Sequence, residues 1–268
     1  MTGDTVSMEF IWPGSVPKGG QFFLIKPRRT GVFLGRPISV AGFKHINRQN
    51  TDIRASTDRR QKADRPVKND RRKKTERRLS SEILLRFLIT RRGQGSRDLV
   101  DLRPGEKAEI IGPLGNSWPL GEIPPGPIAL IAGGVGIAPL LAVIPELGKR
   151  PFDFYAGFKS NPFGFEHIKS RSLIISTEDG IQGVKGLIPD YFNPLGYKAV
   201  FACGPEPMLK AVTLSCISGG VPCYISIERT MACGVGACLG CTIKTSQGNR
   251  CSCVDGPVFN AEEIYFER

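Results

Sequence analysis

The sequence has no apolar run long enough to span a membrane as a helix, and its first residues, MTGDTVSMEF, lack the charged and apolar regions of a signal peptide. We therefore expect a cytoplasmic protein, in which clustered cysteines are metal ligands rather than disulfides. The 32 glycines and 21 prolines punctuate apolar runs without forming tracts, which argues against a disordered chain. A length of 268 residues with 40% hydrophobic content predicts a well-buried core divided between two domains.

Histidine is also scarce, with two residues in the chain. His45 stands at the start of a basic segment and His167 in a polar segment, so we expect both to be structural or solvated. We find no convincing pair of residues for acid–base catalysis. Any redox or transfer chemistry would then belong to cofactors that the chain positions.

Positive charge is concentrated in one place. Residues 44–78 hold 14 Lys/Arg against 5 Asp/Glu, a balance of +9 out of the net +12, so the rest of the chain carries about +3. Apolar residues nearly vanish between 44 and 80, and we expect a solvated, mobile surface insertion, tolerated because closure entropy grows slowly with loop length. The alternative is an electrostatic docking arm for an acidic partner or nucleic acid. The segment has no interleaved aromatic residues, so base stacking is not expected.

The hydrophobic pattern divides the chain into three parts. Residues 1–125 read as short strands separated by turns, which predicts an antiparallel β-barrel, about one strand short at its N-terminal end. Residues 126–222 alternate apolar strands with helix-length segments and predict a Rossmann-like α/β domain, with helices on both faces of a parallel sheet and an amphipathic helix after its first strand. Residues 223–268 form a glycine- and cysteine-rich segment.

Five of the eight cysteines fall between residues 233 and 253. Cys233, Cys238 and Cys241 have the spacing C-x4-C-x2-C, and Cys253 follows after 11 residues, which is typical of a plant-type [2Fe–2S] cluster. Structural zinc is the alternative, but it usually takes ligands in two close pairs. Cys251 is a rival fourth ligand on spacing alone. Cys216 and Cys223 read as buried small residues rather than as ligands.

Two glycine-containing loops predict a dinucleotide site. In IAGGVGIAPL (131–140), Gly133, Gly134 and Gly136 follow a strand and open a helix whose N–H groups can receive a pyrophosphate. The loop is not GxGxxG and is weak alone, but FACGPEPML (201–209) ends a later parallel strand, where ligands bind in open α/β sheets. Cys203 there could serve packing alone.

A third motif, GRPISVAGF (35–43), offers contacts for a flavin. Arg36 provides a guanidinium fork suited to phosphate, and the Ser39 hydroxyl could reach a ring nitrogen. Without further context, these residues could belong to any strand of a barrel.

Taken in order, the motifs resemble one family. The motifs that carry this resemblance are RPIS (36–39), GQGS (93–96), GPLGN (112–116), GGVGIAP (133–139), CGPEPM (203–208) and the tail MACGVGACLGC…CVDGPVF. The chain resembles the electron-transfer subunit of NAD-dependent (type 1B) dihydroorotate dehydrogenase, within the ferredoxin–NAD(P) reductase superfamily. The likeness covers nearly the whole chain except 44–78. The DGPVF tail, one residue after a cysteine, is its most specific part, and its register favours Cys253 over Cys251.

This resemblance implies a set of site residues. FAD would be bound by Arg36, Pro37, Ile38, Ser39, Leu88, Ile89, Thr90, Gly95 and Ser96. NAD would be bound by Gly133, Gly134, Gly136, Cys203, Gly204 and Pro205. The [2Fe–2S] ligands would be Cys233, Cys238, Cys241 and Cys253, near a partner interface at 231–259.

The resemblance also implies a path for electrons. Dihydroorotate is oxidised at FMN on a separate catalytic subunit, in a heterotetramer with two copies of each chain, and electrons cross the cluster singly to FAD, which passes a hydride to NAD+. A related NAD(P)H–ferredoxin or sulfide-type reductase subunit with another partner is the alternative, and a nucleic-acid-binding protein using the basic segment is a third interpretation. Lys159 could meet the 2′-phosphate of NADP, or it could be an ordinary surface lysine. NAD rather than NADP is expected from the resemblance alone.

Overall fold

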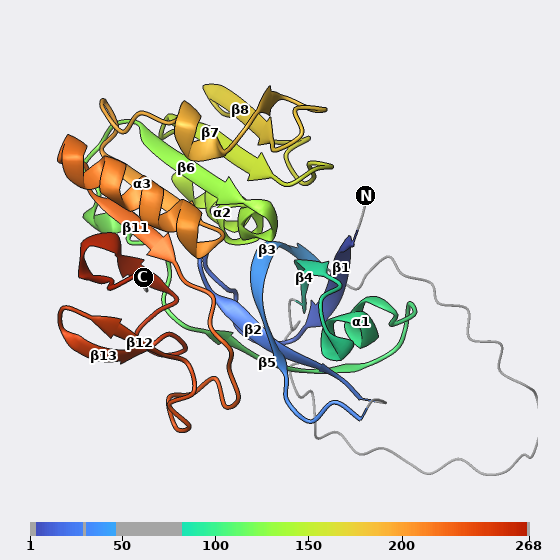
Figure 1. Ribbon diagram of the computed structural model, residues 1–268. Helices are drawn as coiled ribbons and strands as arrows, with labels where there is room; N and C mark the ends of the chain where they lie inside the picture. Colours follow the sequence, from blue (N-terminus) through green and yellow to red (C-terminus); the bar gives the residue numbers. More distant parts are fainter. Residues whose placement is uncertain (1–3, 29–30, 47–81, 267–268) are drawn as a thin grey trace, which may run out of the picture.

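The computed structural model describes residues 4–28, 31–46 and 82–266, and it places two β-sheets on either side of a short central helix (Figure 1). Among these residues, we find no helix that is both long and apolar enough to cross a lipid bilayer.

The N-terminal sheet has five antiparallel strands in the order β1-β4-β3-β2-β5. Their bounds are β1 Thr5–Trp12, β2 Phe22–Pro27, β3 Arg36–Ile46, β4 Glu82–Thr90 and β5 Ala108–Leu114. Burial alternates along the first half of β4, β2 is buried over its first four residues, and Phe23, Phe87 and Leu85 lie in a fully buried core. The ring centroids of Phe23 and Phe87 lie 5.7 Å apart in an edge-to-face contact. The pairings found in the described residues leave β1 and β5 as the two edges of the sheet.

Strand β3 is longer than predicted. It continues through Lys44 and His45 to Ile46, and Ile46 pairs with Glu82 of β4. The predicted insertion at 44 therefore begins three residues too early, because ladder hydrogen bonds to β4 hold these polar residues in the sheet. Residues 47–78 of the predicted insertion lie outside the described part of the chain.

The second sheet has seven strands in the order β14-β11-β10-β6-β7-β8-β9. The bounds are β6 Ile128–Gly133, β7 Phe152–Phe158, β8 Ser172–Thr177, β9 Val184–Lys185, β10 Ala199–Cys203, β11 Cys223–Ser226 and β14 Val258–Asn260. All pairs are parallel except β11 with β14. The runs IALIAG (β6) and AVFAC (β10) are buried along their whole length, as expected for central strands covered on both faces.

The helices cover the seven-stranded sheet less evenly than predicted. Helix α2 (Ile137–Val143) and helix α3 (Glu206–Gly219) lie on opposite faces, and the third helix, α1 (Gln94–Val100), follows β4 in the N-terminal sheet. The described segments after β7 and β8 form turns and short 3-10 elements instead of helices. Glycine and proline interrupt both segments, as in Pro162 and Gly164, and this prevents regular helices.

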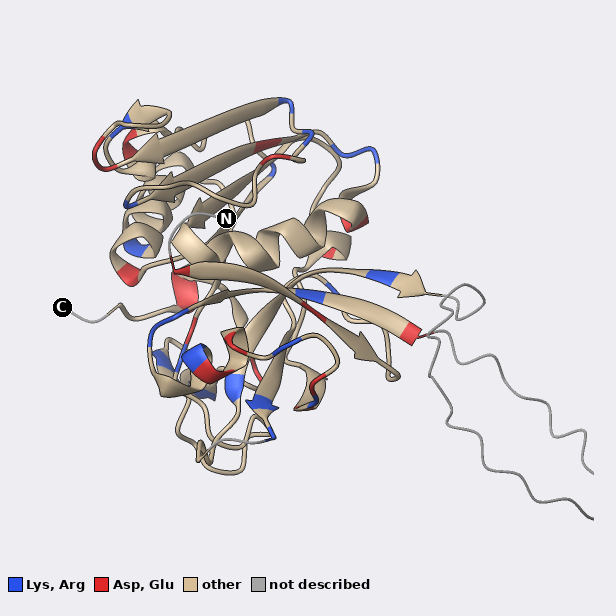
Figure 2. Ribbon diagram, turned by 90° about the vertical axis from the view of Figure 1, so that its right-hand side faces the viewer, with Lys and Arg blue, Asp and Glu red and all other residues tan. Residues whose placement is uncertain are grey.

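Helix α2 also differs from the predicted amphipathic helix, because all its residues except Leu141 are buried. Its outer face packs against β3 of the N-terminal sheet, and because IAPLLAV contains no Lys, Arg, Asp or Glu, its ribbon between the two layers is tan in Figure 2. Trp118, in the connection between the sheets, closes the same junction: its indole N–H donates to the Pro139 carbonyl at 3.2 Å and its ring stacks on Phe201 at 4.8 Å.

The C-terminal segment leaves the seven-stranded sheet after β11 and returns to its edge as β14. The predicted boundary at residue 223 falls inside this sheet, because Cys223–Ser226 pairs with β10. Between β11 and β14 the chain forms a cysteine loop and a two-stranded hairpin, β12 (Thr242–Thr245) with β13 (Gly248–Cys251). This part lies beside β2 and β5, where Gly234 packs within van der Waals distance of Leu24.

Candidate functional site

The two sheets enclose a cavity of about 670 Å³, which we call the interdomain cavity. Its walls come from β3 and β4, from the N-terminal part of α2, and from the segment 226–231 that follows β11. The carboxyl end of the parallel strand β11 therefore opens into it, as is usual for ligand sites in open α/β sheets. The volume lies in the range of cofactor pockets.

Most of the residues predicted to bind FAD line this cavity. They are Arg36, Pro37, Ile38, Ser39, Leu88, Ile89, Thr90 and Ser96. The first four belong to β3 and the next three to β4, and these neighbouring antiparallel strands present their side chains at one end of the N-terminal sheet.

Gly95 is the one predicted FAD residue that is not among the residues lining this cavity, and its phosphate contact stays a prediction. A Cβ atom at Gly95 would lie 2.5 Å from Nε of Arg36, so the guanidinium packs directly against the glycine backbone. Nη1 of Arg36 also donates a hydrogen bond to the Leu34 carbonyl at 2.8 Å. A side chain at position 95 would displace this guanidinium, and Gly95 therefore supports Arg36 instead of lining the cavity.

The Ser96 hydroxyl is engaged within its own turn. Its oxygen accepts the backbone N–H groups of Arg92 and Gly93 at 2.9 and 3.1 Å, and the hydroxyl donates to the Gly93 carbonyl at 2.9 Å. These bonds fix the loop that enters α1, and they bring Arg92 and Gly93 to the cavity wall. The wall also includes Arg229, so three guanidinium groups line a space that could accept a pyrophosphate.

The two loops predicted to bind the dinucleotide touch each other. A Cβ at Gly136 would lie 2.3 Å from the Cys203 carbonyl oxygen, and a Cβ at Gly133 would lie 2.5 Å from Cδ of Pro205. This close approach is possible only with glycine. Gly134, with φ +55°, has no atom within 4 Å of its would-be Cβ, so the turn is open on that side.

Cys203 is 1% exposed at the end of β10. Burial, and to a lesser extent the Glu228 carboxylate, raise the pKa of its thiol well above the ordinary value. A protonated, enclosed thiol packs well and is a poor nucleophile.

The four predicted cluster ligands gather beside β2 as an outer pair, Cys233 and Cys238, and a buried pair, Cys241 and Cys253. Cys241 and Cys253 are each 2% exposed, whereas Cys238 is exposed and Cys233 half-buried. The described residues contain no group of three or more metal-binding side chains arranged for one metal ion. Two pairs of thiols fit the four-thiolate donor set of a two-iron cluster.

Backbone N–H groups point at these sulfurs. Cys233 Sγ accepts from Val235 at 3.5 Å and from Cys238 at 3.4 Å, and Cys253 Sγ accepts from Gly236 at 3.2 Å. The N–H groups of Val235 and Cys238 lower the pKa of Cys233 to about 6. Burial raises the pKa of Cys253 to about 11, with the neighbouring Cys241 adding to the rise. The loop thus presents donors that stabilise negative sulfur.

Cys251, the rival fourth ligand, lies on the hairpin. It pairs with Thr242 in the β12–β13 ladder, and its sulfur is 3.9 Å from the Thr242 hydroxyl. Its backbone N–H donates to the Asp255 carboxylate at 2.7 Å. Gly236 directs its N–H to Cys253 instead, so the geometry favours Cys253.

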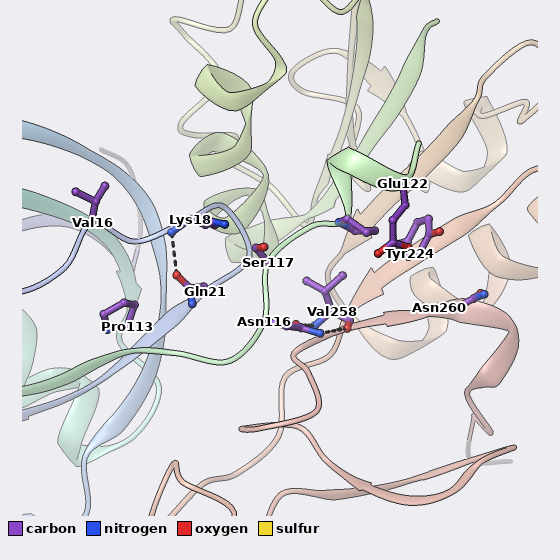
Figure 3. A pocket seen from close by; sticks show the side chains of 11 residues that line it. Val16, Lys18, Gln21, Pro113, Asn116, Ser117, Glu122, Tyr224, Val258 and Asn260 are labelled. Atoms are coloured by element: carbon purple, nitrogen blue, oxygen red, sulfur yellow. Dashed lines mark hydrogen bonds between the residues drawn. The ribbon is translucent and has the colours of Figure 1, made fainter. Parts of the chain in front are cut away.

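A second cavity, of about 660 Å³, lies where the two sheets and the C-terminal segment meet (Figure 3). Asn116 lines this cavity and bonds to the backbone of Val258. Its side-chain amide donates to the Val258 carbonyl at 2.8 Å and accepts the Val258 N–H at 3.0 Å. It also donates to the Asp255 carbonyl at 3.0 Å. One side chain therefore caps the edge strand β14 and ties the cysteine-bearing segment to the connection between the sheets.

Comparisons with known proteins agree on one family. Residues 228–265 match the family described as the iron–sulfur cluster binding domain of dihydroorotate dehydrogenase B. The chain is 42% identical over 182 residues to the dihydroorotate dehydrogenase B (NAD(+)) electron transfer subunit of Clostridium acetobutylicum, covering 67% of this chain and 74% of the relative. The protein of the same name from Caldanaerobacter subterraneus subsp. tengcongensis is 32% identical over 274 residues, covering 99% of this chain and 94% of the relative.

The chain belongs to the family of dihydroorotate dehydrogenase B electron transfer subunits.

Solved structures agree on the fold. An NADH-dependent reduced ferredoxin-NADP oxidoreductase superposes with a TM-score of 0.71 at 24% identity, covering 98% of this chain and 86% of that one. The ferredoxin reductase of carbazole 1,9a-dioxygenase gives a TM-score of 0.57 at 20% identity, covering 83% of this chain and 64% of that one. Membership of the electron transfer subunit family confirms the predicted family, fold class and electron-transfer function. The predicted cofactors, FAD, a [2Fe–2S] cluster and NAD, agree with this family and its iron–sulfur domain.

Sequence reasoning missed several parts of the site in this electron transfer subunit. The cavity wall also includes Phe22, Arg92, Gly93, Val135, Ala138, Pro257 and the segment 226–231. Segment 226–231 could have been expected, because it follows a parallel strand, but the sequence reading assigned that strand to the cysteine-rich part. Phe22 and Pro257 carry no local signal, since their place in the wall depends on how the three parts pack.

Proposed function

We propose that this chain receives electrons from a dihydroorotate-oxidising partner subunit and delivers them to NAD+. Cys233, Cys238, Cys241 and Cys253 hold the [2Fe–2S] cluster, and the interdomain cavity holds FAD. The observation that carries this proposal is the course of segment 226–231. It begins at the end of β11 in the seven-stranded sheet, lines the cavity, and is followed two residues later by Cys233. One short segment thus connects the three expected cofactor sites.

The chain positions its cofactors and tunes their surroundings. FAD, when bound, exchanges single electrons with the cluster and a hydride with NAD. Arg36 and Arg92 bind the flavin pyrophosphate, and the Ser39 hydroxyl donates a hydrogen bond to the ring. The contact between the loops at Gly133 and Gly204 leaves a bare backbone surface on which the dinucleotide lies. Phe22 and Leu88 exclude water from the apolar side of the cavity.

The nicotinamide preference we propose is for NAD. Lys159 is exposed after β7, at the edge where the adenosine end of a dinucleotide lies. The backbone N–H of Glu178 donates to the Phe158 carbonyl at 3.2 Å, so an exposed carboxylate stands at the same edge. A carboxylate there accepts ribose hydroxyls and repels a 2′-phosphate. A lower KM for NADH than for NADPH would support this preference, and the reverse order would overturn it.

The partner we propose is an FMN-containing catalytic subunit, in a heterotetramer with two copies of each chain. Val235, Leu239 and Val254 are 59%, 64% and 54% exposed around the outer thiols. Apolar side chains grouped beside an exposed ligand such as Cys238 are suited to burial by a partner. A cytoplasmic location is part of the proposal, because free thiolate ligands need a reducing compartment.

Anaerobic purification with analysis of iron, sulfide, zinc and flavin tests the proposal. We expect about two irons, two sulfides and one FAD per chain, the composition of one [2Fe–2S] flavoprotein. Zinc without flavin would overturn it. Coexpression with candidate FMN-binding subunits, followed by mass measurement of the complex, tests the heterotetramer separately.

A further inference from the structure

Two side chains are shared between the interdomain cavity and the packing around the buried thiols. Phe22, the first residue of β2, is 2% exposed, and Met231, the last residue of segment 226–231, is 6% exposed. Both line the cavity. Both also belong to one buried cluster with Leu24, Cys241 and Cys253. These two side chains therefore belong both to the cavity wall and to the buried cluster that contains the thiols.

The thiols in this cluster are the inner pair. Cys241 and Cys253 are almost completely enclosed, whereas Cys238 faces solvent. The two pairs of ligands therefore lie on different sides of the cysteine segment. One pair lies toward the cavity wall and the other lies toward the outer surface.

The cysteine loop leaves little space at this wall. A Cβ on Gly234, which has φ +71°, would lie 2.7 Å from Cδ1 of Leu24 and 3.0 Å from Cδ1 of Leu114. The loop backbone thus rests directly on β2 and β5. Methionine suits the remaining gap, because its unbranched chain adapts to irregular spaces.

We propose that Phe22 and Met231 are positioning residues that hold the buried pair Cys241 and Cys253 against the interdomain cavity, and that their packing sets the rate of electron exchange between flavin and cluster. The inference rests on the proposed function. Each crossing oxidises the cluster by one electron and reduces the flavin by one electron. Two crossings and one proton from water complete the flavin reduction that hydride transfer to NAD+ reverses.

Rapid anaerobic mixing of the purified holoprotein with NADH tests the inference, because flavin bleaching and cluster bleaching are recorded as separate phases. Met231→Ala opens a void at the wall. We expect the rate constant of its flavin phase to stay within about twofold of the wild-type value. The rate constant of its cluster phase should fall by about tenfold, which is about 1.4 kcal/mol in activation free energy. Met231→Leu refills the volume and should restore most of the rate. Phe22→Leu tests the second side chain independently, should Met231→Ala fail to retain its cluster.

Ile243→Ala is the matched control. Ile243 is 4% exposed on β12, packs in the core that includes α3, and does not itself line the cavity. Its loss should leave both phases unchanged. Cluster phases at the wild-type rate in Met231→Ala and Phe22→Leu, with full cofactor content, would overturn the inference, and so would equal slowing in Ile243→Ala. Absence of flavin and cluster from the wild-type chain would instead refute the proposed function.

Discussion

At the scale of single residues, backbone N–H groups donate to the sulfurs of Cys233, Cys238 and Cys253, which supports the proposed ligand set. Cys238→Ser should lose the visible absorbance of the cluster while FAD is still reduced by NADH, because the interdomain cavity contains no part of Cys238. Visible spectra and iron analysis of anaerobically purified protein measure this. Cys251→Ser is the matched control and should keep the cluster, since Gly236 donates to Cys253. Cluster loss in Cys251→Ser with retention in Cys238→Ser would refute the ligand set.

Ser39 offers a second test at this scale. It lies in β3 on the wall of the interdomain cavity. Ser39→Ala removes a hydroxyl that we expect to orient the flavin ring, so hydride transfer should slow by about 10–100-fold, the effect of losing about 1.5–3 kcal/mol of hydrogen bonding to a charged or polarised group. Single-turnover reduction of FAD by NADH measures the rate, and iron content should not change. An unchanged rate would remove Ser39 from the site.

At the scale of secondary-structure elements, a buried carboxylate anchors β7. Asp153 accepts two hydrogen bonds from the Arg171 guanidinium, at 2.9 and 2.6 Å, and one from the Tyr197 hydroxyl at 2.7 Å. The Arg171 hydrogen bonds lower the pKa of Asp153 below its ordinary 3.8, against the opposing effect of burial. A lowered carboxyl pKa means that the stabilisation is present above the unfolded-state pKa and is lost as pH falls through the folded-state value.

Asp153→Asn should therefore lower the free energy of unfolding at pH 7 by about 1–3 kcal/mol. This range already allows for solvent screening, because Arg171 is partly exposed. The gap between wild type and variant should narrow as the pH falls below 3.8, the ordinary value for this carboxyl. Urea unfolding of both proteins at several pH values measures this difference in the free energy of unfolding. Asp101→Asn, at a surface pair with Arg91, should change stability by less than about 1 kcal/mol. A pH-independent gap would contradict the assignment of the effect to the charge of Asp153.

The edge strand β14 is held by hydrogen bonds with the side-chain amide of Asn116. Asn116→Ala leaves the outward N–H and C=O groups of Val258 without their amide partner, and we expect a loss of about 1–3 kcal/mol. Because this amide ties the C-terminal segment to the rest of the chain, hydrogen exchange at Val258 should accelerate and the cluster should be lost faster on exposure to air. Asn249→Ala, on the exposed hairpin, is the control and should behave like wild type. Equal behaviour of the two variants would show that the amide does not hold the segment.

At the scale of the whole molecule, we expect the redox sites not to depend on residues 47–81 of the basic segment. Ile46 and Glu82 pair directly at the ends of β3 and β4, so an Asn-Gly turn can replace residues 47–81 without moving either strand. We expect this deletion to keep FAD, iron and reduction by NADH, and to abolish any salt-sensitive binding to nucleic acid. Cofactor analysis and binding titrations at several salt concentrations measure both. Loss of FAD on deletion would place the segment within the flavin site.

The sequence by itself determined which chemistry the chain can perform. The spacing of Cys233, Cys238 and Cys241, the glycines at 133–136 and the apolar runs of the central strands are local patterns, and a thiolate, a bare backbone turn or a buried strand needs those residue types wherever it occurs. The apolar runs also predicted strands β1 to β8 and β10, because each of these strands shows its burial within a few residues, whereas β9 and β11 to β14 were not predicted.

Only the tertiary structure decided what lies between the patterns. Gly95 packs against Arg36, α2 is buried except at Leu141, β11 belongs to the parallel sheet, and Phe22 and Met231 belong to both the cavity wall and the cluster around the buried thiols. Each of these facts depends on contacts between segments far apart in the chain. A local pattern records which side of an element is apolar, but the partner that covers that side is chosen by the packing of the whole molecule.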